Sequence, residues 1–362
     1  MRIVRIMAIA TALVAGAAPA LSQRWPTRPM TLVVPFAAGG TSDVIARLLA
    51  EGLRAQLGQP VLVENVGGAG GMVGGSRVAK SPPDGYQMVL GNVGTHAQNQ
   101  SLYKRPLYNA ASDFAPVALV TDQSLALVAR KDFPASNLRE FTAYAKANPS
   151  TVQYGSAGSG GSNHLACALL NSALGINATH VPYRSGAQAM QDMLAGRIDY
   201  QCPSAPVALP QIAAGAVKAF AILSRNRSAS MPSLPSAHEQ GLTDFDIPTW
   251  YALFLPARTP KSMVQQLNKA TVETLANPTV QQRLKEIGSR SGSARAYDAR
   301  LSRHVHRGGD REMGEDHQGK RHLARVTDSS SARPRVRQAA ETPRLSVRAR
   351  YGRGGCPRPY GE

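Results

Sequence analysis

Short apolar runs alternate with helical stretches over the first part of the chain. From Thr31 to about Ala118 the apolar runs read TLVVPF, PVLVEN and YQMVLGN. The first run is followed by a loop of small residues and then by apolar positions at helical spacing: Val44, Ile45, Leu48, Leu49 and Leu53. Strands that alternate with helices favour a largely parallel sheet with covering helices.

A second α/β region follows from about Ser124 to Gln240. Strands are predicted at LALVARK, TVQYGSAG and THVPY, and helices at SNHLACALLNSALG and GAQAMQDMLAGRID. The late strand IPTWYALFLPARTP and the helices after it return most simply to the first sheet. The chain then crosses twice, through PVALVTDQSLALVA and IPTWYALFLPA, which is typical of two lobes hinged around a cleft. We expect residues 23–122 and 244–290 to form one lobe and residues 123–243 the other.

The first residues predict export. MRIVRIMAIATALVAGAAPALSQ places Arg2 and Arg5 before an apolar stretch and ends in small residues suited to cleavage before Gln23. The alternative, a membrane anchor, is disfavoured because the apolar run is shorter than the ~20 residues that span a bilayer. Residues 1–22 are therefore predicted to be a signal peptide, and the mature protein is expected to be periplasmic.

Three cysteines in a chain of 362 residues exclude a small disulfide-dense domain. Export still permits one bridge, and Cys167 and Cys202 are the candidate pair, with Cys356 left over. Against the bridge, both positions are apolar enough for free buried cysteines. We favour the bridge.

The net charge of +18 is concentrated near the end of the chain. Residues 291–362 hold 16 of the 41 Lys and Arg and 8 of the 23 Asp and Glu, which gives +8, and the arginines of the signal add +2. The remaining chain lacks the clustered basic and aromatic residues of a nucleic-acid surface, so no nucleic-acid partner is expected. The tail contains no Ile, Phe or Trp, and such a composition predicts disorder.

Two interpretations of the tail remain open. It could be a basic arm for nucleic acid or membrane. The alternative is a frameshift: Gly309–Thr327, read one nucleotide later with permitted codons, can spell EIEKWGKTIKESGISPE followed by a stop. That peptide is an amphipathic terminal helix, and we favour the frameshift. Resequencing the gene tests it.

The loop AAGGTSD between the first strand and its helix is a candidate anion site. It lacks the lysine of a phosphate loop and the spacing of a dinucleotide fingerprint. Free N–H groups in the first turn of a helix nevertheless favour a carboxylate. The loop's candidate ligand-binding residues, together with the aromatic residue before it, are Phe36, Gly39, Gly40 and Thr41. The alternative is a plain strand-to-helix connection with an N-cap.

Asp43 follows this loop in the first helical turn. Its simplest interpretation is a partner of the helix dipole. If it pointed into the cleft, it would repel a second carboxylate and attract an ammonium group. It is kept as a candidate binding residue, and the dipole role is preferred.

The second region offers a similar loop, GSAGSGGSNH, at the start of its own helix. Ser156, Ser159 and Ser162, with the glycines between them, predict a small-residue nest for an anion, and His164 lies at the helix entrance. The alternative is a flexible connection.

Other candidates stand near neighbouring helices. Arg184, next to Tyr183 in VPYRSGAQAM, is a candidate clamp because its fork binds two carboxylate oxygens at once. It is equally typical of an exposed surface arginine. Asn92 and Thr95 in GNVGTHAQN are candidate donors in the cleft.

No catalytic motif is present. Ser162, His164 and Asp199 suggest a hydrolase, but Ser162 lacks the Gly-x-Ser-x-Gly elbow and His164 follows two positions along the same helix start. His-Glu-x-x-His, Cys-x-x-Cys and paired-carboxylate motifs are also missing. We expect no enzyme, no cofactor and no metal site. A secreted hydrolase on a similar two-lobed α/β fold is the alternative, and a basic-tailed interaction protein is a third hypothesis.

Successive blocks of the chain together resemble a known family. WPTRPMTLVVPFAAGGTSDVIARLLAEGL, GAGGMVGGSRVAKSPPDGY, YGSAGSGGSNHL, THVPYRSGAQAMQDMLAGRIDY and TWYALFLPARTP are similar to the Bug family, in unbroken order over roughly residues 24–290. These proteins are the receptors of tripartite tricarboxylate transporters. The resemblance implies a type II periplasmic binding fold with a central cleft, a small carboxylic acid as ligand, delivery to a membrane permease, and a monomer. It favours a ligand-binding role for the AAGGTSD loop.

Overall fold

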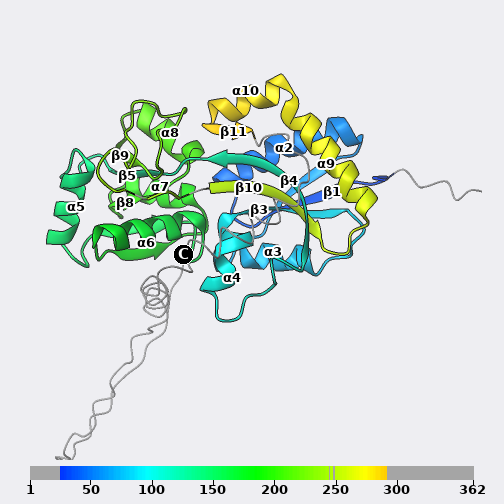
Figure 1. Ribbon diagram of the computed structural model, residues 1–362, viewed down its shortest axis with the longest axis horizontal. Coiled ribbons are helices and arrows are strands. Elements are labelled where there is room, and N and C mark those ends of the chain that lie inside the picture. Colours follow the sequence, from blue (N-terminus) through cyan, green and yellow to red (C-terminus); the bar gives the residue numbers. More distant parts are fainter. Residues whose placement is uncertain (1–24, 244, 248, 292–362) are drawn as a thin grey trace, which may run out of the picture.

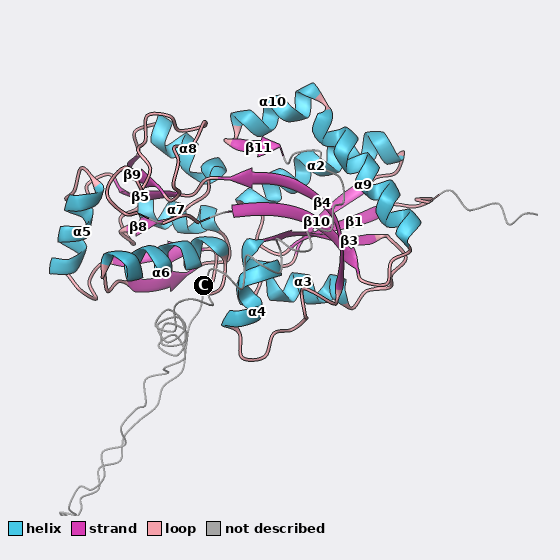
Figure 2. Ribbon diagram, in the orientation of Figure 1, coloured by secondary structure: helices cyan, strands magenta, loops and turns pink. Residues whose placement is uncertain are grey.

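The computed structural model describes residues 25–243, 245–247 and 249–291. Figure 1 shows two lobes side by side, one formed by the first and last described segments and the other by the middle of the chain. The predicted signal peptide and residues 292–362 of the basic tail lie outside the described residues, whereas Ser291 is described. In both lobes helices lie against the strands of a sheet (Figure 2).

Lobe 1 is built on a six-stranded sheet. Its strands are β1 (Met30–Val34), β2 (Val61–Asn65), β3 (Gln87–Asn92), β4 (Phe114–Gln123), β10 (Thr249–Pro256) and β11 (Ser289–Ser291). Their order across the sheet is β11-β4-β10-β3-β1-β2. β1 runs parallel to β2 and β3, whereas β10 runs antiparallel to β3 and β4. The returning strand therefore sits in the middle of the first sheet.

Helices cover both faces of this sheet (Figure 1). They are α2 (Thr41–Leu57), α3 (Met72–Ala79), α4 (Asn99–Leu102), α9 (Lys261–Ala276) and α10 (Pro278–Glu286), with a 3-10 turn η1 (Ala69–Gly71) and a π-helical turn η2 (Gly94–Gln98). Successive strand residues point to opposite faces. Leu32 therefore belongs to the core cluster under α2 and α9, and Val33 to the cluster under α3.

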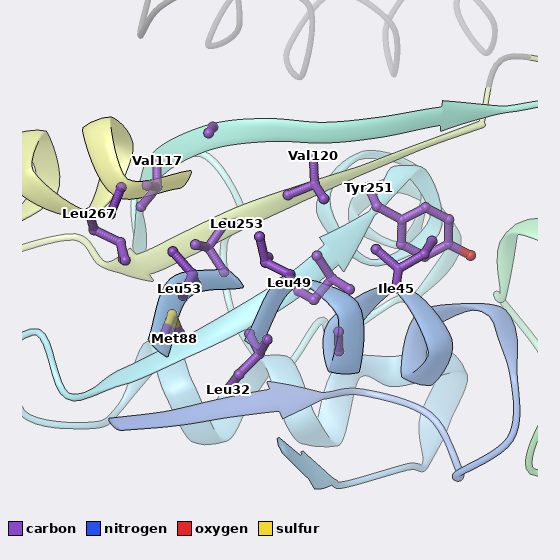
Figure 3. Close-up of a cluster of buried hydrophobic side chains, with 14 of the residues drawn as sticks. Leu32, Ile45, Leu49, Leu53, Met88, Val117, Val120, Tyr251, Leu253 and Leu267 are labelled. Atoms are coloured by element: carbon purple, nitrogen blue, oxygen red, sulfur yellow. The ribbon is translucent and has the colours of Figure 1, made fainter. Parts of the chain in front are cut away.

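The core under α2 explains why this segment is helical. Ile45, Leu49 and Leu53 are spaced four apart, so they share one face and are buried against the sheet and Leu267 of α9 (Figure 3). Gly58, in the left-handed region at φ 67°, ends the helix. The buried face fixes α2 to the sheet and hence the position of its N-terminus.

Lobe 2 is built on a five-stranded sheet. Its strands are β5 (Ala126–Arg130), β6 (Gln153–Ser156), β7 (Thr179–Pro182), β8 (Tyr200–Gln201) and β9 (Val217–Ile222), in the order β7-β6-β8-β5-β9. Its helices are α5 (Leu138–Ala147), α6 (Ser162–Leu174), α7 (Gly186–Leu194) and α8 (Ala205–Ala213). The core contains the aromatic rings of Phe133, Phe141, Tyr200 and Phe220, which contact one another edge-on or tilted.

The two lobes are joined by adjacent strands. β4 leads through Ser124 and Leu125 into β5, and Ile247, which is bonded to lobe 2, precedes β10. β4 and β10 are paired, with Gln123 opposite Thr249, so both crossings lie side by side. The predicted two-lobed α/β fold with two crossings is confirmed.

A disulfide joins Cys167 of α6 to Cys202 just after β8, with the two Cα atoms 5.6 Å apart. Both residues are fully buried in the core of lobe 2. The bridge spans 35 residues, and closing a loop of that length in the unfolded chain stabilises the fold by about 4 kcal/mol in the chain-entropy account. Cys356 lies outside the described residues.

Candidate ligand-binding site

A cavity lies between the lobes beside the two crossings. Its empty space is about 470 Å³ with the open mouth included. Both lobes and the crossing strands line it. The lining residues are Phe36, Gly40, Thr41, Ser42, Asn92, Leu125, Ala157, Ser162, Asn163, Ser185, Gly186, Pro203, Ser204, Val207 and Tyr251.

Three helices begin at this cavity. Thr41 and Ser42 open α2, Ser162 opens α6, and Gly186 opens α7. In the described part of the chain, the backbone N–H groups of these four residues donate to no acceptor. α2 and α6 also begin at glycines, Gly40 and Gly161, that supply no capping side chain. Free donors and the positive ends of three helix dipoles therefore face one small space, which favours an anion.

No charged side chain is among the described residues that line the cavity. Its polar groups are hydroxyls, carboxamides and backbone amides. An anion bound there would be held by fixed dipoles rather than by a cation. The shape of the cavity and the geometry of its hydrogen-bonding groups can then select one ligand over another.

Tyr251 of β10 stands at the base of the cavity and connects both lobes. It lines the cavity together with Ser42 and Asn92 of lobe 1 and Ser204 of lobe 2, and its ring is buried. Burial raises the pKa of Tyr251, although these three polar side chains act in the opposite direction. Ser204 also bonds Thr41 across the cleft, with 2.7 Å between the two hydroxyl oxygens. Ser204 stands at the N-cap of α8, but its hydroxyl does not cap that helix.

Asp43 supports the first loop from behind and does not line the cavity. Its carboxylate accepts hydrogen bonds from the Gly39 N–H, Arg47 Nε and Asn65 Nδ2, each at 3.0 Å. Asn65 also donates to the Phe36 carbonyl. Burial alone would raise the pKa of Asp43, but the hydrogen bonds outweigh it and lower the pKa. Gly39 and Asp43 thus shape the loop that presents Gly40 and Thr41.

Neutral histidines support the second loop. Ser156 Oγ lies 2.6 Å from His180 Nε2, and the Gly160 N–H donates to His164 Nδ1 at 3.2 Å. The two imidazole rings are 4.1 Å apart. Burial lowers the pKa of His164 to about 4, and burial together with the charge of His164 lowers the pKa of His180 to about 3. Ser156 and His164 hold the loop that ends in Ser162.

The remaining sequence-predicted residues lie beside the cavity. Thr95 Oγ1 accepts from the Asn92 N–H at 2.9 Å and so supports a lining residue. The Tyr183 hydroxyl donates to Asp192 at 2.8 Å. Arg184 is exposed, and its carbonyl, not its guanidinium, meets lobe 1 by accepting from the Ala37 N–H. Ser159 is half-buried, and its carbonyl accepts from the Tyr103 hydroxyl at 2.9 Å.

Five polar lining residues were not among the sequence-predicted candidates: Ser42, Asn163, Ser185, Ser204 and Tyr251. Ser185 carries a usable signal, since it is a serine directly before a predicted helix, whereas the helix after Ser204 was not predicted. Ser42 and Asn163 adjoin predicted residues. Tyr251 carries no signal, because its continuous apolar strand pattern does not reveal that the strand passes beside the cavity.

The hydrolase triad considered from the sequence is not assembled. In the described residues no hydrogen bond joins Ser162, His164 and Asp199, and the Asp199 carboxylate is occupied by Arg130 and the Gln153 N–H. No group of three or more His, Cys, Asp or Glu residues in the described ranges could hold a metal ion. No helix in those ranges is long and apolar enough to cross a membrane.

Two α/β lobes joined by paired strands, with a polar cavity beside the crossings, define a binding protein of the two-lobed periplasmic class. Residues 45–310 match the model of the tripartite tricarboxylate transporter family receptor. The chain belongs to this family, so the resemblance stated above is confirmed.

Individual relatives agree with the family. A protein from the ttuE-ttuC' intergenic region of Agrobacterium vitis is 40% identical over 265 residues, which cover 73% of this chain and 76% of the relative. The periplasmic binding protein BugD is 36% identical, with a TM-score of 0.75, and 84% of this chain and 98% of BugD are covered. MatC from Rhodopseudomonas palustris with bound malate is 34% identical, with a TM-score of 0.76 and coverage of 83% and 99%.

Proposed function

We propose that the protein is a periplasmic receptor that binds a small carboxylic acid and delivers it to a membrane permease. One observation carries the proposal: unpaired N–H groups at the starts of α2, α6 and α7 converge on a cavity with no charged lining residue. Such a site suits a carboxylate, whose oxygens accept from several amides at once.

The two lobes contribute differently to this site. Lobe 1 offers the amides of Thr41 and Ser42, and lobe 2 offers those of Ser162 and Gly186. A ligand that bridges them gains contacts only when the lobes are together. Binding would thereby favour the closed form that a permease can recognise.

The comparisons support this proposal. MatC holds malate, a small dicarboxylate, and its likeness covers 83% of this chain. The family description names a transporter, which supports a permease as partner. The predicted signal peptide supports a periplasmic location. The proposed receptor is not an enzyme.

A thermal-shift screen tests the proposal. The panel contains malate, succinate, citrate, aspartate, glutamate and benzoate, with succinamide as the uncharged counterpart of succinate. An acid at 100 times its Kd is expected to stabilise the protein by about 2.7 kcal/mol, and succinamide to have no effect. No shift with any acid would overturn the carboxylate assignment. Steady ester hydrolysis that Ser162→Ala abolishes would favour the hydrolase instead.

A further inference from the structure

The lobes also meet at a second place, outside the residues that line the cavity. Lobe 1 contributes Gly70, Gly94 and the segment Asn99–Tyr103, and lobe 2 contributes Ser159 and Gly160. We call this contact the seam. It lies in the loop that leads directly into α6.

Tyr103 makes the polar contact of the seam. Its hydroxyl donates to the Ser159 carbonyl at 2.9 Å, and its ring lies against Gly160. The side chain is half-buried, and burial raises the pKa of Tyr103, so the phenol stays protonated and able to donate. A hydrogen bond of this kind has a partner on each lobe and exists only when the lobes are together.

Glycines let the two backbones meet closely. A Cβ added at Gly70 would lie 2.3 Å from the Ser159 carbonyl oxygen, and one at Gly160 would lie 2.5 Å from Asn99 Oδ1. A Cβ at Gly94 would lie 3.0 Å from both the Gly160 oxygen and the Ser162 nitrogen. These three positions therefore leave no room for a side chain, and the close approach brings lobe 1 against the first turn of α6.

This placement connects the seam to the cavity. Gly160 is two residues before Ser162, whose N–H belongs to the cavity, and the Gly160 N–H is fixed by His164. Docking of the loop against Tyr103 thus sets the position of the α6 amides relative to α2. Tyr103 itself does not line the cavity.

We propose that Tyr103 is a positioning residue for ligand binding: its hydrogen bond to Ser159 clasps the closed lobes and holds the α6 N-terminus in place without touching the ligand. The inference rests on the proposed function, since closure matters only if a ligand binds between the lobes. A clasp of this kind changes the population of the closed form, so it affects every ligand by the same factor.

Tyr103→Phe removes the hydroxyl and keeps the ring. We expect the Kd for malate and for citrate to rise by the same factor, about two- to tenfold, with faster dissociation. Tyr86→Phe is the matched control, because among the described residues the Tyr86 hydroxyl bonds only Thr27, within lobe 1. It should bind as the wild type does. Unchanged affinity in Tyr103→Phe, or a loss confined to one acid, would overturn the clasp.

Hydrogen exchange of the peptide 158–163 tests the same contact without any acid. We expect its amides to exchange about two- to tenfold faster in Tyr103→Phe than in wild type or Tyr86→Phe. Equal exchange would also overturn the clasp. If the wild type bound no acid but exchange still rose in Tyr103→Phe, the proposed function would fail while the clasp contact stood. If acids bound the wild type but Tyr103→Phe changed neither the Kd nor the exchange rate, the proposed function would stand and the clasp would be wrong.

Discussion

The loops at the starts of α2 and α6 present the same chemical groups but are supported by opposite kinds of side chain. In lobe 1 the loop is held by the ionised carboxylate of Asp43, which accepts from Gly39, Arg47 and Asn65. In lobe 2 the loop is held by the neutral rings of His164 and His180. In both loops, backbone N–H groups of the first helical turn donate to no acceptor among the described residues.

The comparison shows that the side chains supporting an anion-binding loop can be either negatively charged or neutral. A carboxylate behind α2 is tolerated because its charge is satisfied by three donors and by its place in the first helical turn. Imidazoles behind α6 serve only while neutral, because protonation would place two cations 4.1 Å apart between ring centroids in a largely apolar site. As the pH falls, the α6 loop of lobe 2 should therefore lose its support before the α2 loop of lobe 1 does.

The largest expected effect is on stability at mildly acid pH. The folded pKa values of His164 and His180, about 4 and about 3, lie below the unfolded value near 6.5. The unfolded chain then binds more protons, so stability is full above pH 6.5 and falls as pH drops toward 4. Each histidine contributes a slope of up to about 1.4 kcal/mol per pH unit. Urea unfolding at pH 7, 6 and 5 measures it.

Two variants sharpen this result. His180→Gln should make the slope between pH 6 and 5 shallower, whereas His238→Gln, at an exposed position of lobe 2, should leave it unchanged. His96 of lobe 1 is buried with its pKa lowered to about 3 and adds to the slope of every variant. Asp43 has a lowered pKa, so its support persists until the pH falls below its usual range. A free energy of unfolding that is constant from pH 7 to 5 would contradict the contrast between the lobes.

The hydrophobic pattern of the sequence predicted the two lobes, because the spacing of apolar residues along the chain indicates each strand and each covering helix. Leu32 and Val33 on successive positions predict a strand covered on both faces, and Ile45, Leu49 and Leu53 predict the helix that covers one of them. α8 was not predicted, because Pro210 lies inside the helix, where proline is unusual. Its first turn is fixed by a tertiary hydrogen bond from the Ala205 N–H to the Ser124 carbonyl.

The candidate site was predicted less completely than the fold. Glycine and serine loops before helices predicted Gly40, Thr41 and Ser162, which line the cavity, since helix starts have a sequence signal. Tyr251 and Ser204 lie together only because two segments that are distant in the sequence meet at the cavity. The spacing of residues along the chain does not reveal such a contact. His164 and Arg184 were placed in the right loops, but side-chain direction depends on packing.

The next effect in size concerns binding through the α2 loop. Gly40 has φ −84° and ψ 172°, which any residue adopts, and a Cβ there would lie 3.5 Å from Ser185 Cβ in ordinary contact. Gly40→Val should fold, but its methyl groups enter the space between the lobes. We expect about 1–3 kcal/mol weaker binding of whichever panel acid binds the wild type, measured by calorimetry.

Gly40→Ala is the matched control, because its single added carbon fits the observed spacing. It should bind much more tightly than Gly40→Val, with melting temperatures close to wild type for both variants. If Gly40→Val bound the acid as well as the parent, the α2 loop would be only a connection, and lobe 2 would carry the site alone.

The smallest effect is expected at Arg184, whose neighbour Ser185 provides the contrast. The Arg184 side chain is exposed and lies outside the lining residues, while its backbone contact with Ala37 survives truncation. Arg184→Ala should change the free energy of unfolding by no more than about 0.5 kcal/mol. Its Kd should stay within twofold of wild type, since an exposed charge contributes little.

Ser185→Ala removes a lining hydroxyl that also accepts from the Gln188 N–H at the start of α7, so about 1 kcal/mol of stability should be lost. A tenfold or greater loss of binding in Arg184→Ala would show that its guanidinium reaches a bound acid, and lobe 2 would then use a cation where lobe 1 uses only amides.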